Sequence, residues 1–211
     1  MIEKKIPFVG LHAHSVAGSI FDAIGYPDEH MDFCYENGGE ALALTDHGNM
    51  NGFSHQFLHW QKMKDEGKEF KPIFGVEAYF LPSIEEWRDD YDRIKEDKKL
   101  AKSLAKQGDT SGATVEDEDA SKKAIKSVIN RRRHLVLLAQ NQTGLNNLFK
   151  LISASYREEN FYRYPRVDYK MLAEHSEGVI AASACLGGPY AGNYWEHRDE
   201  GPEAVREAMR E

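Results

Sequence analysis

The sequence predicts an α/β fold, in which short buried strands alternate with helices. Short apolar runs recur along the chain and are nearly continuous rather than alternating, which is typical of strands covered on both faces. These runs are 8–11, 41–44, 73–76, 135–138 and 179–182. Stretches with a helical pattern separate them at 27–38, 51–66, 142–156 and 169–176. This order favours a parallel sheet.

Residues 84–133 interrupt the alternation, because this segment is rich in charge and poor in apolar residues. We interpret it as a charged insertion that forms a solvated helical excursion with a mobile, dispensable centre near 107–120. Three consecutive arginines, 131–133, end the segment. They could contact phosphates, and a solvated basic turn is an equally good interpretation.

Length and composition set broad limits on the class of protein. A chain of 211 residues can bury one domain core, and no apolar run approaches the roughly 18 residues that a membrane span requires. The N-terminus lacks the pattern of an export signal, and two cysteines are too few for a disulfide framework. We therefore expect a cytoplasmic protein. The net charge of −8 disfavours indiscriminate nucleic-acid binding, although it leaves room for a local basic groove or for bound cations.

Polar residues that could bind a metal follow several of the predicted strands. A lone histidine is more often structural than a ligand, but His12 and His14 are one residue apart, which places both imidazoles on the same side of an extended segment. Such residues lie at or just after the ends of apolar runs: His12, His14, Asp22, His47, Glu77 and Cys185. Histidine, carboxylate and thiolate suit zinc, or manganese or iron where carboxylates dominate. Strand ends on one side of an α/β fold converge on a ligand site.

Seven motifs occur in an order that resembles a known family. They are His12-Ala-His14-Ser, Phe21-Asp22, Leu-Thr-Asp-His-Gly-Asn-Met at 44–50, Pro-Ile-Phe-Gly-Val-Glu-Ala-Tyr at 72–79, His-Leu-Val-Leu-Leu-Ala-Gln-Asn at 134–141, Phe-Tyr-Arg-Tyr-Pro-Arg-Val-Asp at 161–168 and Ser-Ala-Cys-Leu-Gly at 183–187. The chain resembles the polymerase-and-histidinol-phosphatase (PHP) domain found at the N-terminus of bacterial and phage replicative DNA polymerase III alpha subunits. The resemblance covers nearly all of residues 1–211 except 84–133.

The resemblance implies a distorted barrel of seven β/α units that holds up to three divalent metal ions. By position, His12 and His14 resemble ligands of one metal, and Glu77 bridges to a second metal. His134 and Cys185 resemble the remaining ligands of that second metal. Asp22 and His47 resemble ligands of a third metal. Asp46 is expected to orient a ligand imidazole. Cys34 is expected to be a small buried residue. The remaining histidines have no counterpart in the motifs: His30, His55, His59, His175 and His197.

The sequence departs from the family pattern near its end. Family members complete the metal set with an Asp-x-His, and none follows Cys185 here; five strand candidates are visible where the family has seven. We therefore expect a barrel that is incomplete at the C-terminus, and one or two bound metals, zinc first. The chain could be a fragment of a longer polymerase, be completed by another chain, or close differently. No polymerase palm motif is present, so this chain is not expected to copy DNA by itself.

Three functions remain open at this point. The first is a metal-dependent phosphoesterase of the 3′–5′ exonuclease type, acting on a primer 3′ end during replication, with weak or absent activity in this chain alone. Arg166 and Tyr162 are candidate phosphate or nucleotide contacts, or else part of a packed aromatic loop. The second is a metal-stabilised, non-catalytic scaffold of the polymerase. The third is a free-standing phosphatase of the histidinol-phosphate type, which the polymerase-like motifs disfavour. The implied partners are DNA, the remaining polymerase domains and replisome subunits, with no membrane.

Overall fold

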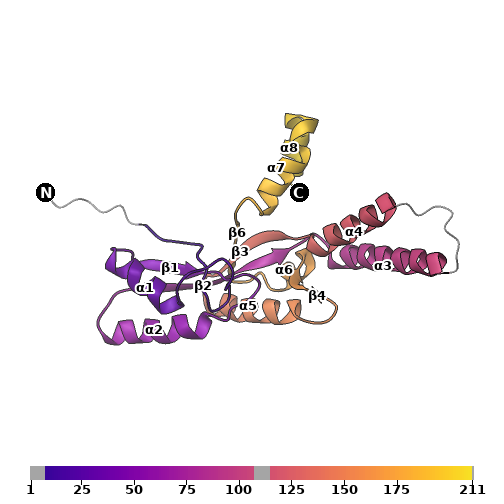
Figure 1. Cartoon of the computed structure of the whole chain (residues 1–211). Coiled ribbons are helices and arrows are strands. Elements are labelled where there is room, and N and C mark those ends of the chain that lie inside the picture. Colours follow the sequence, from indigo (N-terminus) through magenta and orange to yellow (C-terminus); the bar gives the residue numbers. More distant parts are fainter. Residues whose placement is uncertain (1–7, 107–114, 211) are drawn as a thin grey trace.

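The computed structural model describes residues 8–106 and 115–210 (Figure 1). Helices and strands alternate over much of this range. In order they are α1 (Pro27–Glu36), β1 (Ala41–Leu44), α2 (Phe53–Asp65), β2 (Lys71–Phe80), α3 (Ile84–Lys106), α4 (Val115–Asn130), β3 (Arg133–Ala139), α5 (Gln142–Ser155), β4 (Phe161–Tyr162), β5 (Tyr164–Val167), α6 (Tyr169–Glu174), β6 (Val179–Ser183), α7 (Pro189–His197), the 3-10 turn η1 (Arg198–Glu200) and α8 (Pro202–Ala208).

The strands form one six-stranded sheet with β2 at its centre. The order is β4-β5-β2-β3-β6, and β1 pairs with the first half of β2. β1 and β5 run parallel to β2, whereas β3 runs antiparallel to β2 and β6 antiparallel to β3. The α/β prediction is confirmed, but the all-parallel arrangement is wrong. Two helices, α3 and α4, return the chain to the end of β2 that it had just left, so β3 must run back along β2.

Within the described residues the two ends of this strand order do not pair, so the sheet is an open, incomplete barrel. The strand predicted at 8–11 is reduced to a single bridge between Gly10 and Leu42. Its neighbours Phe8 and Leu11 are exposed, because few other elements cover this part of the chain. The short strands β4 and β5 were not expected from the sequence, and they meet at Arg163, whose φ of 60° makes the hairpin turn.

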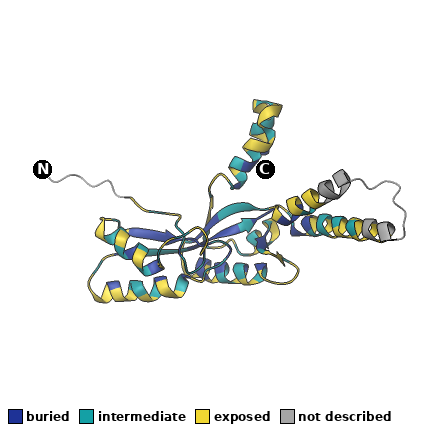
Figure 2. Ribbon diagram, in the orientation of Figure 1, coloured by how far each residue is buried: buried dark blue, intermediate teal, exposed yellow. Residues whose placement is uncertain are grey.

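The main core lies between the sheet and α5. Val76, Ala78 and Phe80 of β2 and Leu137 of β3 pack with Leu148 and Leu151 of α5, and all six are at most 4% exposed. The helix begins where the sequence predicts, because the Asn141 side chain accepts a hydrogen bond from the backbone of Gly144. Figure 2 shows that the deepest burial follows these strands and the helix faces beneath them.

The charged insertion folds as a helical hairpin. α3 and α4 project together from one end of the sheet (Figure 1). At its base, Trp87 is 3% exposed and packs with Val128, and its indole N–H donates to the Val128 carbonyl at 2.8 Å. Of the predicted mobile centre at 107–120, residues 107–114 lie outside the described part of the chain. Its mobility and dispensability therefore stay predictions.

The C-terminal helices contact the sheet mainly at β3, where Arg133 pairs with Glu196 of α7. After β6 the chain leads into α7 and α8, which extend away from the other helices (Figure 1). Four of the five residues of β6 are exposed, and so are large side chains of α7 such as Tyr190 and Trp195. None of the helices in 8–106 and 115–210 combines the length and the apolar character that a membrane crossing requires.

Candidate metal centre

A ring of four imidazoles surrounds the carboxylate of Glu77 in the middle of β2. His14 Nε2 lies 3.0 Å from one carboxylate oxygen, His47 Nδ1 lies 2.9 Å from the same oxygen, and His12 Nε2 lies 3.8 Å from it. His134 Nδ1 lies 3.0 Å from the other oxygen. Glu77 is 1% exposed. These five predicted ligands therefore come from four separate segments and meet at one point.

Backbone pairing places each of these residues. Gly10 and Ala13 accept hydrogen bonds from Ala43 and Thr45, which fixes the extended segment that carries both N-terminal histidines along β1. Just past the end of β1, His47 forms a bridge with Glu77. On the other side of β2, His134 lies opposite Tyr79, two residues beyond Glu77, and thus on the same face of the sheet.

The tautomer of His12 follows from its hydroxyl partner. Thr45 Oγ1 lies 2.7 Å from His12 Nδ1 and 3.3 Å from the Ala13 carbonyl. Because the carbonyl can only accept, the hydroxyl donates to it and accepts from His12 Nδ1–H. His12 Nε2 is then left with a free lone pair directed towards the cluster, as a metal ligand requires. Thr45 was missed at the sequence level, although its place one residue before Asp46 offered a weak signal.

Asp22 provides a second carboxylate on the open side of the cluster. One of its oxygens lies 2.6 Å from His47 Nε2, and the other lies 3.5 Å from His14 Nδ1. Its side chain is 48% exposed, compared with 1% for Glu77. His14 and His47 therefore each lie between a buried and an exposed carboxylate, and the cluster opens to solvent on the Asp22 side.

Asp46 has a different role from the predicted one. Its side chain, 3% exposed, accepts hydrogen bonds from the backbone N–H of Ser15 at 2.7 Å and from the hydroxyls of Ser15 and Ser19 at 2.8 and 2.9 Å. Within the described chain these serines are its hydrogen-bond partners, and no imidazole is among them. The predicted orientation of a ligand imidazole by Asp46 is therefore wrong. Asp46 instead ties the loop between His14 and Asp22 to the end of β1.

The donors fit a divalent metal ion. The two Glu77 oxygens and His47 Nδ1 are buried. None of these three atoms has a hydrogen bond of normal geometry in the described chain. Ligand atoms about 2.1 Å from zinc lie about 3.4 Å apart at a tetrahedral angle and about 3.0 Å apart at a right angle. The distances from Glu77 to the nitrogens of His14, His47 and His134, 2.9–3.0 Å, match the right-angle spacing, and His12 lies further out at 3.8 Å. Three overlapping sets have all their donor atoms within 4.8 Å of one another: His12, His14 and Glu77; His14, Asp22 and His47; and His47, Glu77 and His134.

The local electrostatics keep a negative charge at the centre. Burial alone would raise the pKa of the Glu77 carboxyl, but the imidazoles of His134, His14 and His47 together hold that pKa far below its ordinary value. Burial lowers the pKa of His12, which favours its neutral, metal-binding form. A deprotonated carboxylate among imidazoles is the ligand state that zinc or manganese requires.

Cys185 lies at the edge of the cluster. Its Sγ atom lies 3.7 Å from His134 Nδ1 and 3.3 Å from the backbone nitrogen of Gly187. Glu77 and His134 thus form a candidate ligand set with His47, where Cys185 was predicted as the third ligand. Cys185 lies beside this set, next to His134. Tyr79, which sequence reasoning missed, stacks on His47 with ring centroids 5.8 Å apart and planes 4° apart. Its position two residues after Glu77 on the same strand was the available signal.

The predicted phosphate contact by Arg166 is wrong. Its side chain is 0% exposed and lies over the Trp87 ring at 4.0 Å. Its guanidinium donates to the backbone carbonyls of Tyr162, Tyr164 and Ile129. Burial, followed by the nearby charge of Arg132, lowers the pKa of Arg166 to about 10. The residue is a structural cation that holds the β4–β5 hairpin, and it has no surface from which to reach a ligand.

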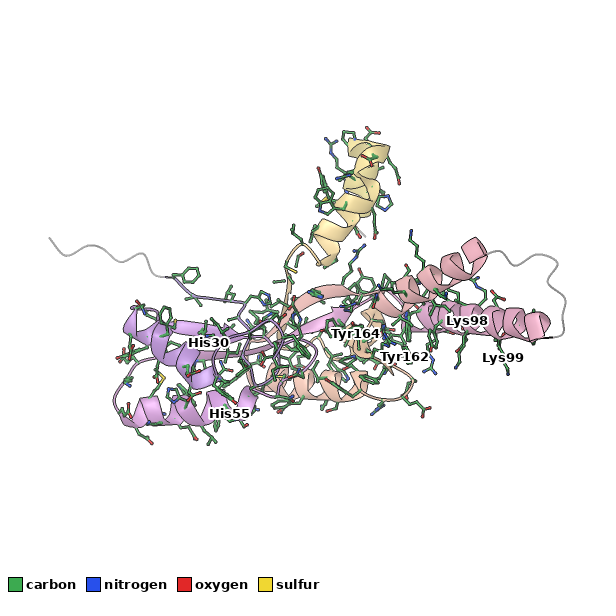
Figure 3. The ribbon with its side chains drawn as sticks, viewed as in Figure 1. His30, His55, Lys98, Lys99, Tyr162 and Tyr164 are labelled. Carbon is green, nitrogen blue, oxygen red and sulfur yellow. The ribbon has the colours of Figure 1, made fainter. Side chains whose placement is uncertain are left out.

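Tyr162 and the remaining histidines lie away from the cluster. Tyr162 is 36% exposed and its ring lies 5.0 Å from that of Tyr91 on α3, so it belongs to the hairpin end of the molecule. Figure 3 shows His30 and His55 on α1 and α2, towards the opposite end from Tyr162 and Tyr164. The remaining histidines lie on or at the end of helices, where His59 pairs with Asp32 and His197 with Glu200.

Comparison with known proteins assigns the family. Residues 10–211 match the family described as the PHP domain. The chain therefore belongs to the PHP domain family.

Several relatives at about one-third identity carry the name DNA polymerase III subunit alpha. Examples are those of Aquifex aeolicus, 34% identical over 181 residues and 86% of this chain; Treponema pallidum, 35% over 189 residues and 88%; and Helicobacter pylori, 37% over 153 residues and 72%. The chain spans only 12%, 12% and 9% of those proteins. A solved chain from Bifidobacterium adolescentis, provisionally described as a metal-dependent phosphoesterase, covers 95% of this chain and is itself covered to 73%. It has 14% identity and a TM-score of 0.38.

Proposed function

We propose that this chain is a metal-binding phosphoesterase domain of a replicative DNA polymerase, of the type that removes nucleotides from a primer 3′ end. The observation that supports it most directly is Glu77, a buried carboxylate whose two oxygens lack normal hydrogen bonds while four imidazole nitrogens lie 2.9–3.8 Å away. Unsatisfied buried oxygens are costly, and a bound cation removes that cost. The relatives, which are polymerase alpha subunits, support DNA as the substrate class.

The residues divide into a buried and an exposed half. Glu77, His134 and His47 would hold one ion on the sheet side, and His14 and His47 with Asp22 would hold another on the open side. His12 adds a free Nε2 next to Glu77. We expect one or two ions, zinc first and manganese or iron as alternatives. A bound divalent ion supplies Lewis-acid polarisation of a phosphate and acidifies water. We expect a phosphodiester to approach from the side of Asp22, because this carboxylate is half-exposed.

Metal analysis and an exonuclease assay test this proposal together. The purified chain is loaded with zinc or manganese, and its metal content is measured alongside nucleotide release from a 5′-labelled single-stranded oligonucleotide. We expect one or two ions per chain and slow release that is lost in Glu77→Gln. His175→Ala is the matched control, because His175 ends α6 away from the cluster. A folded chain that binds no metal contradicts the whole proposal.

A metal-stabilised scaffold is the second candidate. Its support is that the cluster joins segments from residue 12 to residue 134, so a bound ion would cross-link much of the domain. In that case zinc raises the melting temperature of the wild-type chain, and no nucleotide is released even at full occupancy. Nucleotide release that disappears with Glu77→Gln would exclude it.

A further inference from the structure

The three consecutive arginines before β3 have different surroundings. Arg131 pairs with Asp90 at 2.7 Å, and Arg133 pairs with Glu196. Arg132 has no ion pair within the described residues; its NH1 donates to the Asn130 carbonyl, and its Nε is buried without a hydrogen-bond partner. Of the three cations, Arg132 alone is thus not neutralised by a carboxylate of the described chain.

Aromatic rings hold the Arg132 guanidinium next to the metal centre. It lies 3.9 Å from the centroid of the Tyr164 ring and 5.2 Å from that of Tyr79. The Tyr79 centroid is itself 5.6 Å from that of His134 and 5.8 Å from that of His47. The guanidinium and the His134 ring are therefore at most about 11 Å apart. Since stacking fixes the plane of a guanidinium, its remaining donors are pre-oriented for an anion.

The charge around this position is also unusual. Arg166 is close enough that the charge of Arg132 helps to lower its pKa, and its guanidinium lies 5.9 Å from the same Tyr164 ring. Arg166 is fully buried and its NH1 and NH2 groups donate to backbone carbonyls, so it adds positive potential without competing for a ligand. Two neighbouring guanidiniums with one set of donors uncommitted create a local site for an anion, in spite of the net charge of −8.

We infer that Arg132 binds a backbone phosphate of the nucleic-acid strand whose 3′ end lies in the metal centre. This inference rests on the proposed function and adds a positioning residue to it. One nucleotide contributes about 3.4 Å of rise along a strand, so the contacted phosphate lies no more than about three nucleotides from the end. Arg132 takes the role that sequence reasoning gave to Arg166, and Arg131 and Arg133 keep their structural partners.

The test measures binding separately from hydrolysis. A fluorescent single-stranded oligodeoxynucleotide with phosphorothioate linkages at its 3′ end is titrated with the zinc-loaded chain at several salt concentrations. We expect Arg132→Gln to raise the dissociation constant about tenfold or more, as loss of a charge-assisted contact does. The slope of log affinity against log salt should fall by about 0.7. Arg132→Lys keeps the charge but loses the planar contact, so its loss should be smaller.

Arg131→Gln and Arg133→Gln are matched controls with the same change of charge, and we expect dissociation constants within about twofold of the wild type. Equal losses in all three variants would show a general charge effect and overturn the inference. So would an unchanged Arg132→Gln, or a wild-type chain that does not bind the probe. A chain that binds with the expected contrast but releases no nucleotide would retain the role of Arg132 and reject the phosphoesterase. Far-UV circular dichroism and zinc content confirm that each variant is folded and loaded.

Discussion

Replacing Asp46 by Asn tests whether the loop that carries Asp22 is held by one buried carboxylate. Asp46 accepts three hydrogen bonds, two from Ser15 and one from Ser19, at 2.7–2.9 Å. Asn is nearly the same size, so the change removes charge without leaving a cavity. It also turns one acceptor into an N–H donor that faces the Ser15 hydroxyl.

The expected loss follows from those three bonds. A hydrogen bond to a charged group contributes about 1.5–3 kcal/mol, compared with about 0.5–1.5 kcal/mol between neutral groups. Losing about 1 kcal/mol at each bond lowers the free energy of unfolding by about 3 kcal/mol. For a chain of this size, that corresponds to a fall in melting temperature of about 6–12 °C.

Urea unfolding at pH 7, followed by circular dichroism on metal-free protein, measures this loss directly. Asp90→Asn is the control, because Asp90 pairs with Arg131 and Arg93 at the surface and should leave the unfolding midpoint near that of the wild type. A loss below about 0.5 kcal/mol for Asp46→Asn would refute the idea that charge-assisted bonds to Asp46 hold this loop.

Three further outcomes follow from other contacts. His134→Ala should lower both the zinc content, measured by mass spectrometry, and the melting temperature. Cys185→Ala should lower both by less, because its thiol lies at the edge of the cluster. His175→Ala should change neither. Arg166→Met should lower the free energy of urea unfolding by about 3 kcal/mol or more, because three carbonyls lose their buried donor; an unchanged midpoint would contradict its structural role. Gly144→Ala should lower the melting temperature markedly, because a Cβ there would lie 1.8 Å from the Gly178 carbonyl oxygen; a normal melting temperature would show that this packing relaxes freely.

The sequence predicted most helices and the meeting of His12, His14, His47, Glu77 and His134. Apolar periodicity marks strands that are buried on both faces, and the polar residues that follow them were expected to converge. His134, which lies at the start of its strand, was assigned through the resemblance to the PHP family. Strand direction was beyond such reasoning, because periodicity does not show whether a connection returns the chain to the same end of the sheet. The 8–11 run failed for a related reason: hydrophobicity indicates what could be buried, and here few partners cover Phe8 and Leu11.

Individual side-chain roles were less predictable than the position of the site. Asp46 precedes a predicted ligand, so an imidazole was the natural partner, yet the serines of a loop 27–31 residues earlier in the chain occupy its oxygens. From the sequence, both Arg166 and Arg132 were candidate phosphate contacts. Only the packing shows that Arg166 is fully buried between Trp87 and backbone carbonyls, whereas Arg132 is partly exposed and lies over the Tyr164 ring. Such choices depend on long-range contacts that no local pattern encodes.

The distribution of the ligands along the chain has a consequence for how the protein is made. His12 and His134 are 122 residues apart, and a ribosome that adds about 5–20 residues per second needs roughly 6–24 s to pass from one to the other. Until β3 has emerged, the nascent chain displays a His-x-His pair and two carboxylates without their closing partner. Under the proposed function, such a partial set would meet ions before the final geometry selects among metals. The ion first bound during synthesis would then depend on which metal is available and not on the finished site.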